Sequence, residues 1–168
     1  MSNNLTISST VFLINIQVNY YFWNFLNFSF DRYLSNYFIF LFQTFSCKFA
    51  YGKFIEFSIL LSNHNFSNTL NAKHKNILFS TDGLSFSFSN NMISKESNYL
   101  FLGEIVISFD DILTKSFFYK ETFMYSCLRV ILHSFLHLLD YNHVTYYCSF
   151  LIKLLELKFL SKSNLINK

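Results

Sequence analysis

Three of the five histidines in this 168-residue chain lie close together near its C-terminal end. His133, His137 and His143 stand in the segment RVILHSFLHLLDYNH with the spacing H-x3-H-x5-H. On a helix, His133 and His137 are one turn apart on the same face. After a short break the chain can bring His143 beside them. Three imidazoles that leave one position open for water are a ligand set of catalytic zinc. The spacing therefore predicts a metal centre that holds one zinc ion per chain.

Two other interpretations of histidines in this chain stay open. A lone histidine is usually a structural residue, and we interpret His64 and His74, which stand apart from the cluster, in this way. Zinc peptidases of the HExxHxxGxxH type share the spacing of the cluster. However, Ser134 stands where their glutamate acts as general base, and Asp140 stands where they have glycine. A hydroxyl does not accept a proton as a carboxylate does, so a zinc metalloprotease is the weaker alternative.

The alternation of apolar and polar residues predicts the elements that position these histidines. Strands are expected over residues 11–18, 54–61, 84–88 and 102–108. Helices are expected over residues 30–48, 63–71, 110–119, 124–139 and 146–160, with Asp110 and Asp111 as N-cap residues. Interspersed strands and helices predict an α/β (α+β) domain with a small mixed sheet of about four strands and about five helices. We expect residues 1–10 to be disordered and residues 11–168 to form this single domain.

The composition limits the classes of protein to consider. Apolar residues make up 52% of the chain and aromatic residues 21%, which excludes an intrinsically disordered protein. The chain has no proline and three glycines, which excludes collagen-like and Pro-rich proteins. A net charge of +3 is compatible with RNA binding but does not establish it. The 24 phenylalanines, together with many residues that have AT-rich codons, indicate an AT-rich genome.

The same composition bears on the compartment. The most apolar stretch, residues 37–50, contains Gln43, Ser46 and Lys48 and is shorter than the roughly 20 residues of a membrane-spanning helix. The N-terminus lacks the positive charge that begins a signal peptide. Three cysteines without a CxxC motif indicate a reducing compartment. We therefore expect a cytoplasmic protein with no membrane partner, from a bacterium, an endosymbiont or an organelle.

Three blocks of the sequence resemble the YbeY family and follow one another in family order. HSFLHLLDYNH over 133–143 resembles the family motif HGxLHLxGYDH and keeps all three histidines. TDGLSFSF over 81–88 resembles TDVLSFPF, and LGEIVIS over 102–108 resembles LGDIVIS. The LN…K pattern of residues 70–75 resembles the family's LN…R, and Glu156 falls where the final helix of the family carries a glutamate.

The resemblance implies a zinc-dependent endoribonuclease that cuts single-stranded RNA. Its partners would be rRNA and the small ribosomal subunit, and its role would be maturation of the 3′ end of small-subunit rRNA and ribosome quality control. In this interpretation His133, His137 and His143 bind zinc and His133 is part of the catalytic centre. Lys75 replaces the family's arginine as the catalytic residue that contacts phosphate. The alternative is a ribosome-associated assembly factor whose catalysis has weakened.

Most departures from the family motifs follow the same mutational bias toward AT-rich codons. The family has proline at Ser80 and Ser87, glycine at Ser134 and Asp140, aspartate at Asn142 and arginine at Lys75. A single C-to-T or G-to-A change accounts for each of these, so mutational drift explains them without a change of function. Gly83, where the family has valine, runs against this bias. Asp140 is expected to adopt the left-handed conformation of the family's glycine at some energetic cost.

Overall fold

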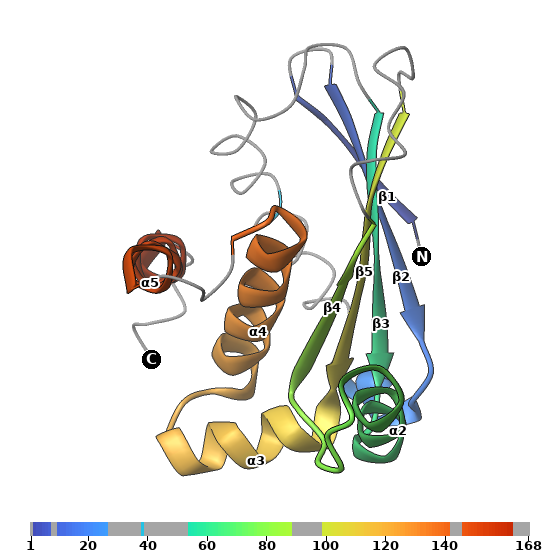
Figure 1. Cartoon of the computed structure of the whole chain (residues 1–168), viewed down its shortest axis with the longest axis vertical. Coiled ribbons are helices and arrows are strands. Elements are labelled where there is room, and N and C mark those ends of the chain that lie inside the picture. Colours follow the sequence, from blue (N-terminus) through green and yellow to red (C-terminus); the bar gives the residue numbers. More distant parts are fainter. Residues whose placement is uncertain are drawn as a thin grey trace.

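A five-stranded mixed sheet forms one layer of the molecule (Figure 1). The computed structural model describes residues 2–7, 10–26, 38, 54–88, 99–141 and 146–162. The strands are β1 (Ser2–Ile7), β2 (Thr10–Val18), β3 (Phe54–Ser62), β4 (Gly83–Ser87) and β5 (Tyr99–Ser108). Their order in the sheet is β1-β2-β3-β5-β4. The three central strands are parallel, and β1 and β4 pair antiparallel at the two edges. The predicted mixed sheet is confirmed.

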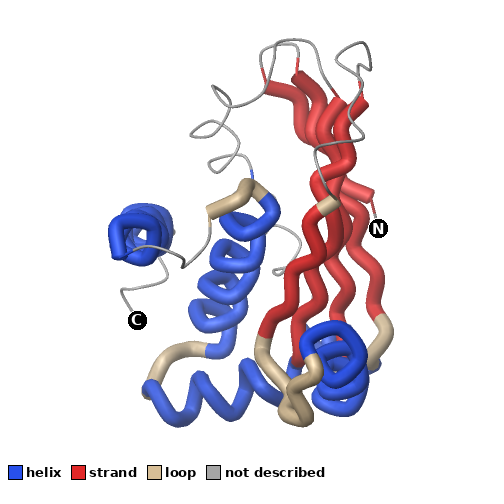
Figure 2. The backbone as a smooth tube through the Cα atoms, viewed as in Figure 1, coloured by secondary structure: helices blue, strands red, loops and turns tan. Residues whose placement is uncertain are grey.

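Four of the five expected helices lie in the part of the chain that the structure describes (Figure 2). They are α2 (His64–Lys75), α3 (Phe109–Tyr119), α4 (Phe123–Leu138) and α5 (Tyr146–Lys162), and a 3-10 helix, η1, covers Tyr21–Leu26. The helix expected over 30–48 lies outside the described residues except for Phe38. Strand β1 differs from the expectation of disorder over residues 1–10. Every helix in the described ranges is too short or too polar to cross a lipid bilayer.

Helix α4 packs against β4 and β5 and forms much of the core (Figure 1). Its sequence is apolar on most sides, which is typical of a buried helix. Phe135 packs against Phe57 of β3 and Phe38, and all three rings are fully buried. The buried residues of α4 are Ser126, Cys127, Leu128, Val130, Ile131, Leu132, Ser134, Phe135, Leu136 and Leu138. This burial fixes the rotation of α4 about its axis.

Helix α2 covers the opposite face of the sheet. Leu60 and Val106, which alternate along their strands with the residues buried under α4, line a groove together with Phe66 and Leu70 of α2. Successive residues of a strand point to opposite faces. Helices α2 and α4 are therefore separated by the sheet.

Glycine is required where β5 meets β4. The register of β3 and β5 shifts after Glu56, so that Phe57 pairs with Gly103 and Leu102 is the extra residue of a β-bulge. Gly103 has a φ of 139°, and a Cβ there would lie 2.1 Å from the carbonyl oxygen of Phe86. No L side chain fits this position, which explains the glycine of the LGEIVIS block.

Gly83, at the start of β4, lies directly against α4. A Cβ at residue 83 would lie 2.7 Å from Val130 Cγ1 and 2.9 Å from Ser134 Oγ. The Ser134 side chain therefore occupies space that a side chain at residue 83 would need. The family motifs have valine where this chain has Gly83, and glycine where this chain has Ser134. The departure that runs against the mutational bias thus compensates for one that follows it.

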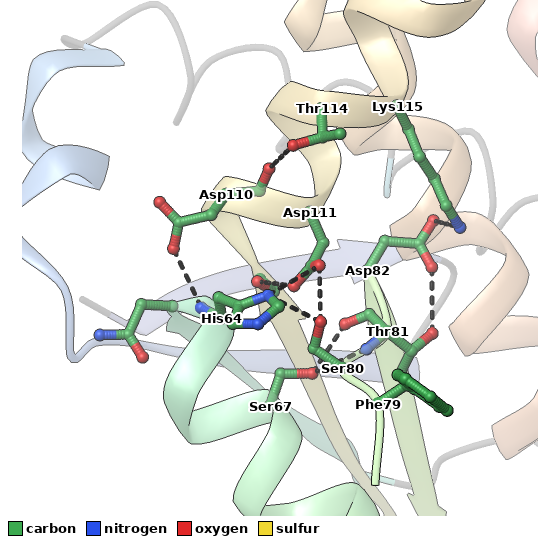
Figure 3. A network of polar contacts seen from close by, with 12 residues as sticks. His64, Ser67, Phe79, Ser80, Thr81, Asp82, Asp110, Asp111, Thr114 and Lys115 are labelled. Atoms are coloured by element: carbon green, nitrogen blue, oxygen red, sulfur yellow. Dashed lines mark hydrogen bonds and ion pairs between the residues drawn. The ribbon is translucent and has the colours of Figure 1, made fainter. Parts of the chain in front are cut away.

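A polar corner joins α2, the segment before β4 and α3 (Figure 3). Ser80 donates a hydrogen bond to Asp111 at 2.7 Å, and Ser108 donates to the same carboxylate. His64 Nδ1 lies 2.7 Å from the Ser80 hydroxyl and 3.1 Å from Asp111 Oδ1. Because both contacts use one ring nitrogen, the cluster is not a Ser-His-Asp relay, in which the two ring nitrogens serve different partners. The corner is structural, and His64 has the structural role expected of it.

The start of α3 differs from the expectation. Ser108 is its N-cap residue, and Asp110 and Asp111 lie in its first turn. Asp110 instead accepts a hydrogen bond from the backbone N–H of His64 at 2.9 Å, at the start of α2. A carboxylate at a helix N-terminus stabilises it, so α3 caps α2 as well as packing beside it.

We expect Gly83→Val to destabilise the protein by about 1–3 kcal/mol, because the added side chain overpacks the contact with α4. Ser134→Gly removes one of the two close contacts, while the contact with Val130 Cγ1 remains, so the double variant should lose less stability than the sum of the two single variants. Chemical denaturation of the four proteins in this double-mutant cycle measures the coupling. Strictly additive losses would contradict the compensation.

The polar corner also predicts an acid-dependent loss of stability. Burial acts to raise the pKa of Asp111, but hydrogen bonds from Ser108, Ser80 and His64 outweigh it, and the pKa lies below its ordinary value. The stabilisation is therefore complete above an ordinary carboxyl pKa of about 3.9 and is lost as the pH falls through the folded-state value. Asp111→Asn should lower the free energy of unfolding at pH 7 by about 1–3 kcal/mol.

Denaturation at several pH values between 7 and 2 checks this prediction. The difference between wild type and Asp111→Asn should shrink as the carboxylate is protonated. Glu104→Gln is the matched control, because Glu104 is exposed on β5. An equal difference at pH 7 and at pH 2 would contradict the role of the Asp111 charge.

Candidate metal centre

His133 and His137 approach each other on α4, as their spacing predicts. Their Nε2 atoms are 3.1 Å apart, and their rings are nearly perpendicular with centroids 4.7 Å apart. Two nitrogens that bind a tetrahedral zinc ion at about 2.0–2.1 Å lie about 3.4 Å from each other. The pair therefore fits two adjacent positions of one metal ion after a small outward shift.

Glu156 of α5 contacts His133 from the other side of the ring. Its Oε1 lies 2.7 Å from His133 Nδ1, and its side chain is 17% exposed. A metal-binding histidine generally donates its second N–H to a carboxylate or carbonyl, which fixes the tautomer. With Nδ1–H directed at Glu156, the lone pair of His133 is on Nε2, the atom that faces His137. Glu156 thus orients His133 without taking a ligand position beside it.

The described residues do not complete a three-ligand metal site. Within those residues no group of three or more His, Cys, Asp or Glu side chains could hold a metal ion. The predicted ligand His143 lies in the range 142–145, which the structure does not describe. His133, His137 and the supporting Glu156 therefore form the described part of the candidate centre.

The turn that follows α4 has the form of a Schellman motif. Asp140 has a φ of 65°, its N–H bonds to the carbonyl of His137 at 3.1 Å, and the N–H of Tyr141 bonds to the carbonyl of Leu136 at 3.0 Å. Asp140 adopts the left-handed conformation predicted for the family's glycine position. The helix therefore ends at Leu138, one residue after His137, and the chain leaves the helix axis at Asp140, before residue 143.

A cleft of about 330 Å³ lies beside His133. Its walls come from the start of β4, α3, α4 and α5. It is lined by Asp82, Gly83, Lys115, Arg129, Val130, His133, Ser134, Ser149, Ile152, Lys153 and Glu156. The orienting carboxylate, one candidate ligand and three cations thus share one cavity.

Two of these cations are held by carboxylates. Lys115 Nζ lies 2.8 Å from Asp82 Oδ2, and the Arg129 guanidinium lies 3.1 Å from Glu121 Oε2. Arg129 also lies over the ring of Tyr119, 5.5 Å from its centroid. These contacts support a structural role for Arg129, which ties α4 to the segment after α3.

Lys75 does not line this cleft. It is the exposed last residue of α2, on the face of the sheet opposite to α4. His74 beside it packs edge-on against Phe86, with ring centroids 5.1 Å apart. No motif of the sequence predicts a role for Lys115 or Lys153 in the site, although Lys153 lies three residues before Glu156. That helical spacing is the signal that links Lys153 to the site.

Comparison with known proteins identifies sequence relatives of this chain. The sequence profile described as Endoribonuclease YbeY matches residues 25–162. Endoribonuclease YbeY of Pelagibacter ubique is 38% identical over 93 residues, which cover 55% of this chain and 60% of that protein. Endoribonuclease YbeY of Ehrlichia chaffeensis is 28% identical over 110 residues, 66% of this chain and 68% of that protein.

The fold has a solved counterpart. The solution structure of a protein from Thermotoga maritima superimposes on this chain with a TM-score of 0.57 at 19% sequence identity. The match covers 89% of this chain and 88% of the Thermotoga chain. This likeness concerns the fold alone. The profile match extends over most of the chain, including the three blocks and the three histidines of the block over 133–143. The chain therefore belongs to the YbeY family.

Proposed function

We propose that this protein is a zinc-dependent endoribonuclease that cuts single-stranded RNA. The observation that carries the proposal is the His133–His137 pair, oriented by Glu156, beside a cleft lined by cations. Relatives named Endoribonuclease YbeY support RNA as the substrate. The proposed substrate is the 3′ end of small-subunit rRNA in the cytoplasm, with a further role in ribosome quality control on the small subunit.

In the proposed mechanism His133, His137 and His143 would hold one zinc ion. Zinc in such a site supplies Lewis-acid polarisation of a phosphodiester and lowers the pKa of water toward neutrality. Glu156 keeps the proton of His133 on Nδ1, which leaves Nε2 available as a ligand. The positive charge of the cleft would attract the RNA backbone toward the histidines. Lys75 remains a predicted phosphate contact, and from the end of α2 it would hold RNA outside this cleft.

One observation favours the alternative of an assembly factor with weakened catalysis. Asp140 adopts a left-handed backbone conformation that glycine would adopt without steric cost, and it lies in the turn that leads to His143. A less tightly held turn would lower metal occupancy. In that case association with the small ribosomal subunit should survive the loss of His137.

We expect His137→Ala to lose bound zinc and most of its endoribonuclease activity, because only two of the three proposed ligands remain. Metal analysis of the purified protein should give about one zinc ion per wild-type chain. Cleavage of an rRNA 3′-end substrate measures the activity. His74→Ala is the matched control, since His74 packs on Phe86 away from the cleft. Undiminished cleavage by zinc-free protein would contradict the mechanism.

Glu156→Ala should weaken zinc binding by about 10–100-fold, the usual effect of losing a carboxylate behind a histidine ligand. Glu156→Gln should lie between this variant and wild type, because its amide oxygen can still accept the His133 proton. Competition with a chelating dye measures the affinity. The control is Glu121→Gln, which removes a carboxylate that contacts Arg129 instead of a histidine. Equal zinc affinity in wild type and Glu156→Ala would refute the orienting role.

A further inference from the structure

The cleft beside His133 contains one cation that no described residue neutralises. Asp82 holds Lys115, Glu121 holds Arg129, and Glu156 contacts His133. In the described ranges Lys153 forms no ion pair. Its side chain is exposed and lines the cleft. The positive charge of Lys153 is therefore available to a ligand.

The position of Lys153 follows from the packing of α5. Ile152 is 2% exposed and fixes which side of α5 faces α4. Lys153 lies one turn before Glu156 and one turn after Ser149, so the three side chains share one side of the helix. All three line the cleft. The helix that orients His133 thus also places an ammonium group and a hydroxyl group beside it.

On the basis of the proposed function, we propose that Lys153 forms a phosphate-binding subsite for the RNA strand. An ammonium group binds phosphate as a point charge with three donors. Lys115 would have to leave Asp82, and Arg129 would have to leave Glu121, before either could bind phosphate fully. Lys153 binds without breaking an ion pair. It is therefore the cation that positions the strand relative to His133.

Salt dependence of RNA binding tests this subsite. Fluorescence anisotropy measures the affinity for a labelled single-stranded RNA over a series of salt concentrations. The proteins compared are wild type, Lys153→Ala, Lys153→Arg and Lys158→Ala. Lys158 is the matched control, because it is an exposed lysine of α5 that does not line the cleft. The same variants are assayed for zinc-dependent cleavage, and a denaturing gel checks that the RNA stays intact during titration.

We expect Lys153→Ala to reduce the slope of log affinity against log salt by about 0.7, the contribution of one phosphate on a single strand. Its KM for RNA should rise while zinc content stays at the wild-type value. Lys153→Arg should restore the slope, and Lys158→Ala should keep it. If wild type cleaves RNA and Lys153→Ala has an unchanged slope, the subsite is refuted and the proposed function stands. If wild type neither binds nor cleaves RNA, both are refuted.

Discussion

The packing of α4 between the sheet and α5 is the constraint on which the candidate site depends. Leu132 and Ser134 are both buried, whereas His133 between them has a side chain that is 39% exposed. The rotation of the helix is therefore set by its apolar neighbours rather than by the histidines. Because His133 and His137 lie one turn apart on this single rigid element, their relative position is fixed before any metal binds. The helix alone organises the pair.

The same packing shows how the chain has tolerated its biased composition. Glycine is scarce, yet Gly103 and Gly83 occupy two positions where a Cβ would collide with neighbouring atoms. At Ser134 the loss of a family glycine is matched by Gly83 on the facing strand. Ser80 replaces a family proline and gains two partners in the polar corner, Asp111 and His64. Mutational drift therefore explains the direction of these changes, while packing and hydrogen bonding explain why the fold accommodates them.

The sequence predicted the elements well because their apolar patterns are strong. The strands around Phe57 and Ile105 and the helix carrying His133 follow directly from alternation and helical spacing. The histidine pair was predictable because residues four apart on a helix must meet. The cleft was not predictable from the sequence, because its cations come from three different helices and no local pattern brings Lys115 and Lys153 together. Sequence spacing also could not show that Asp110 caps α2 rather than its own helix.

The position of Lys75 changes how the family motif is to be understood in this chain. A charged residue that aligns with a family arginine preserves charge, but the sheet separates α2 from α4 and from the cleft beside His133. Charge close to the histidines has to come from elements on their own side of the sheet. Helix α5 meets that need with Lys153, and it also supplies Glu156 to His133. A single helix, held by Ile152, thus couples the orientation of a candidate ligand to the charge of the cleft, so displacement of α5 would disturb both together.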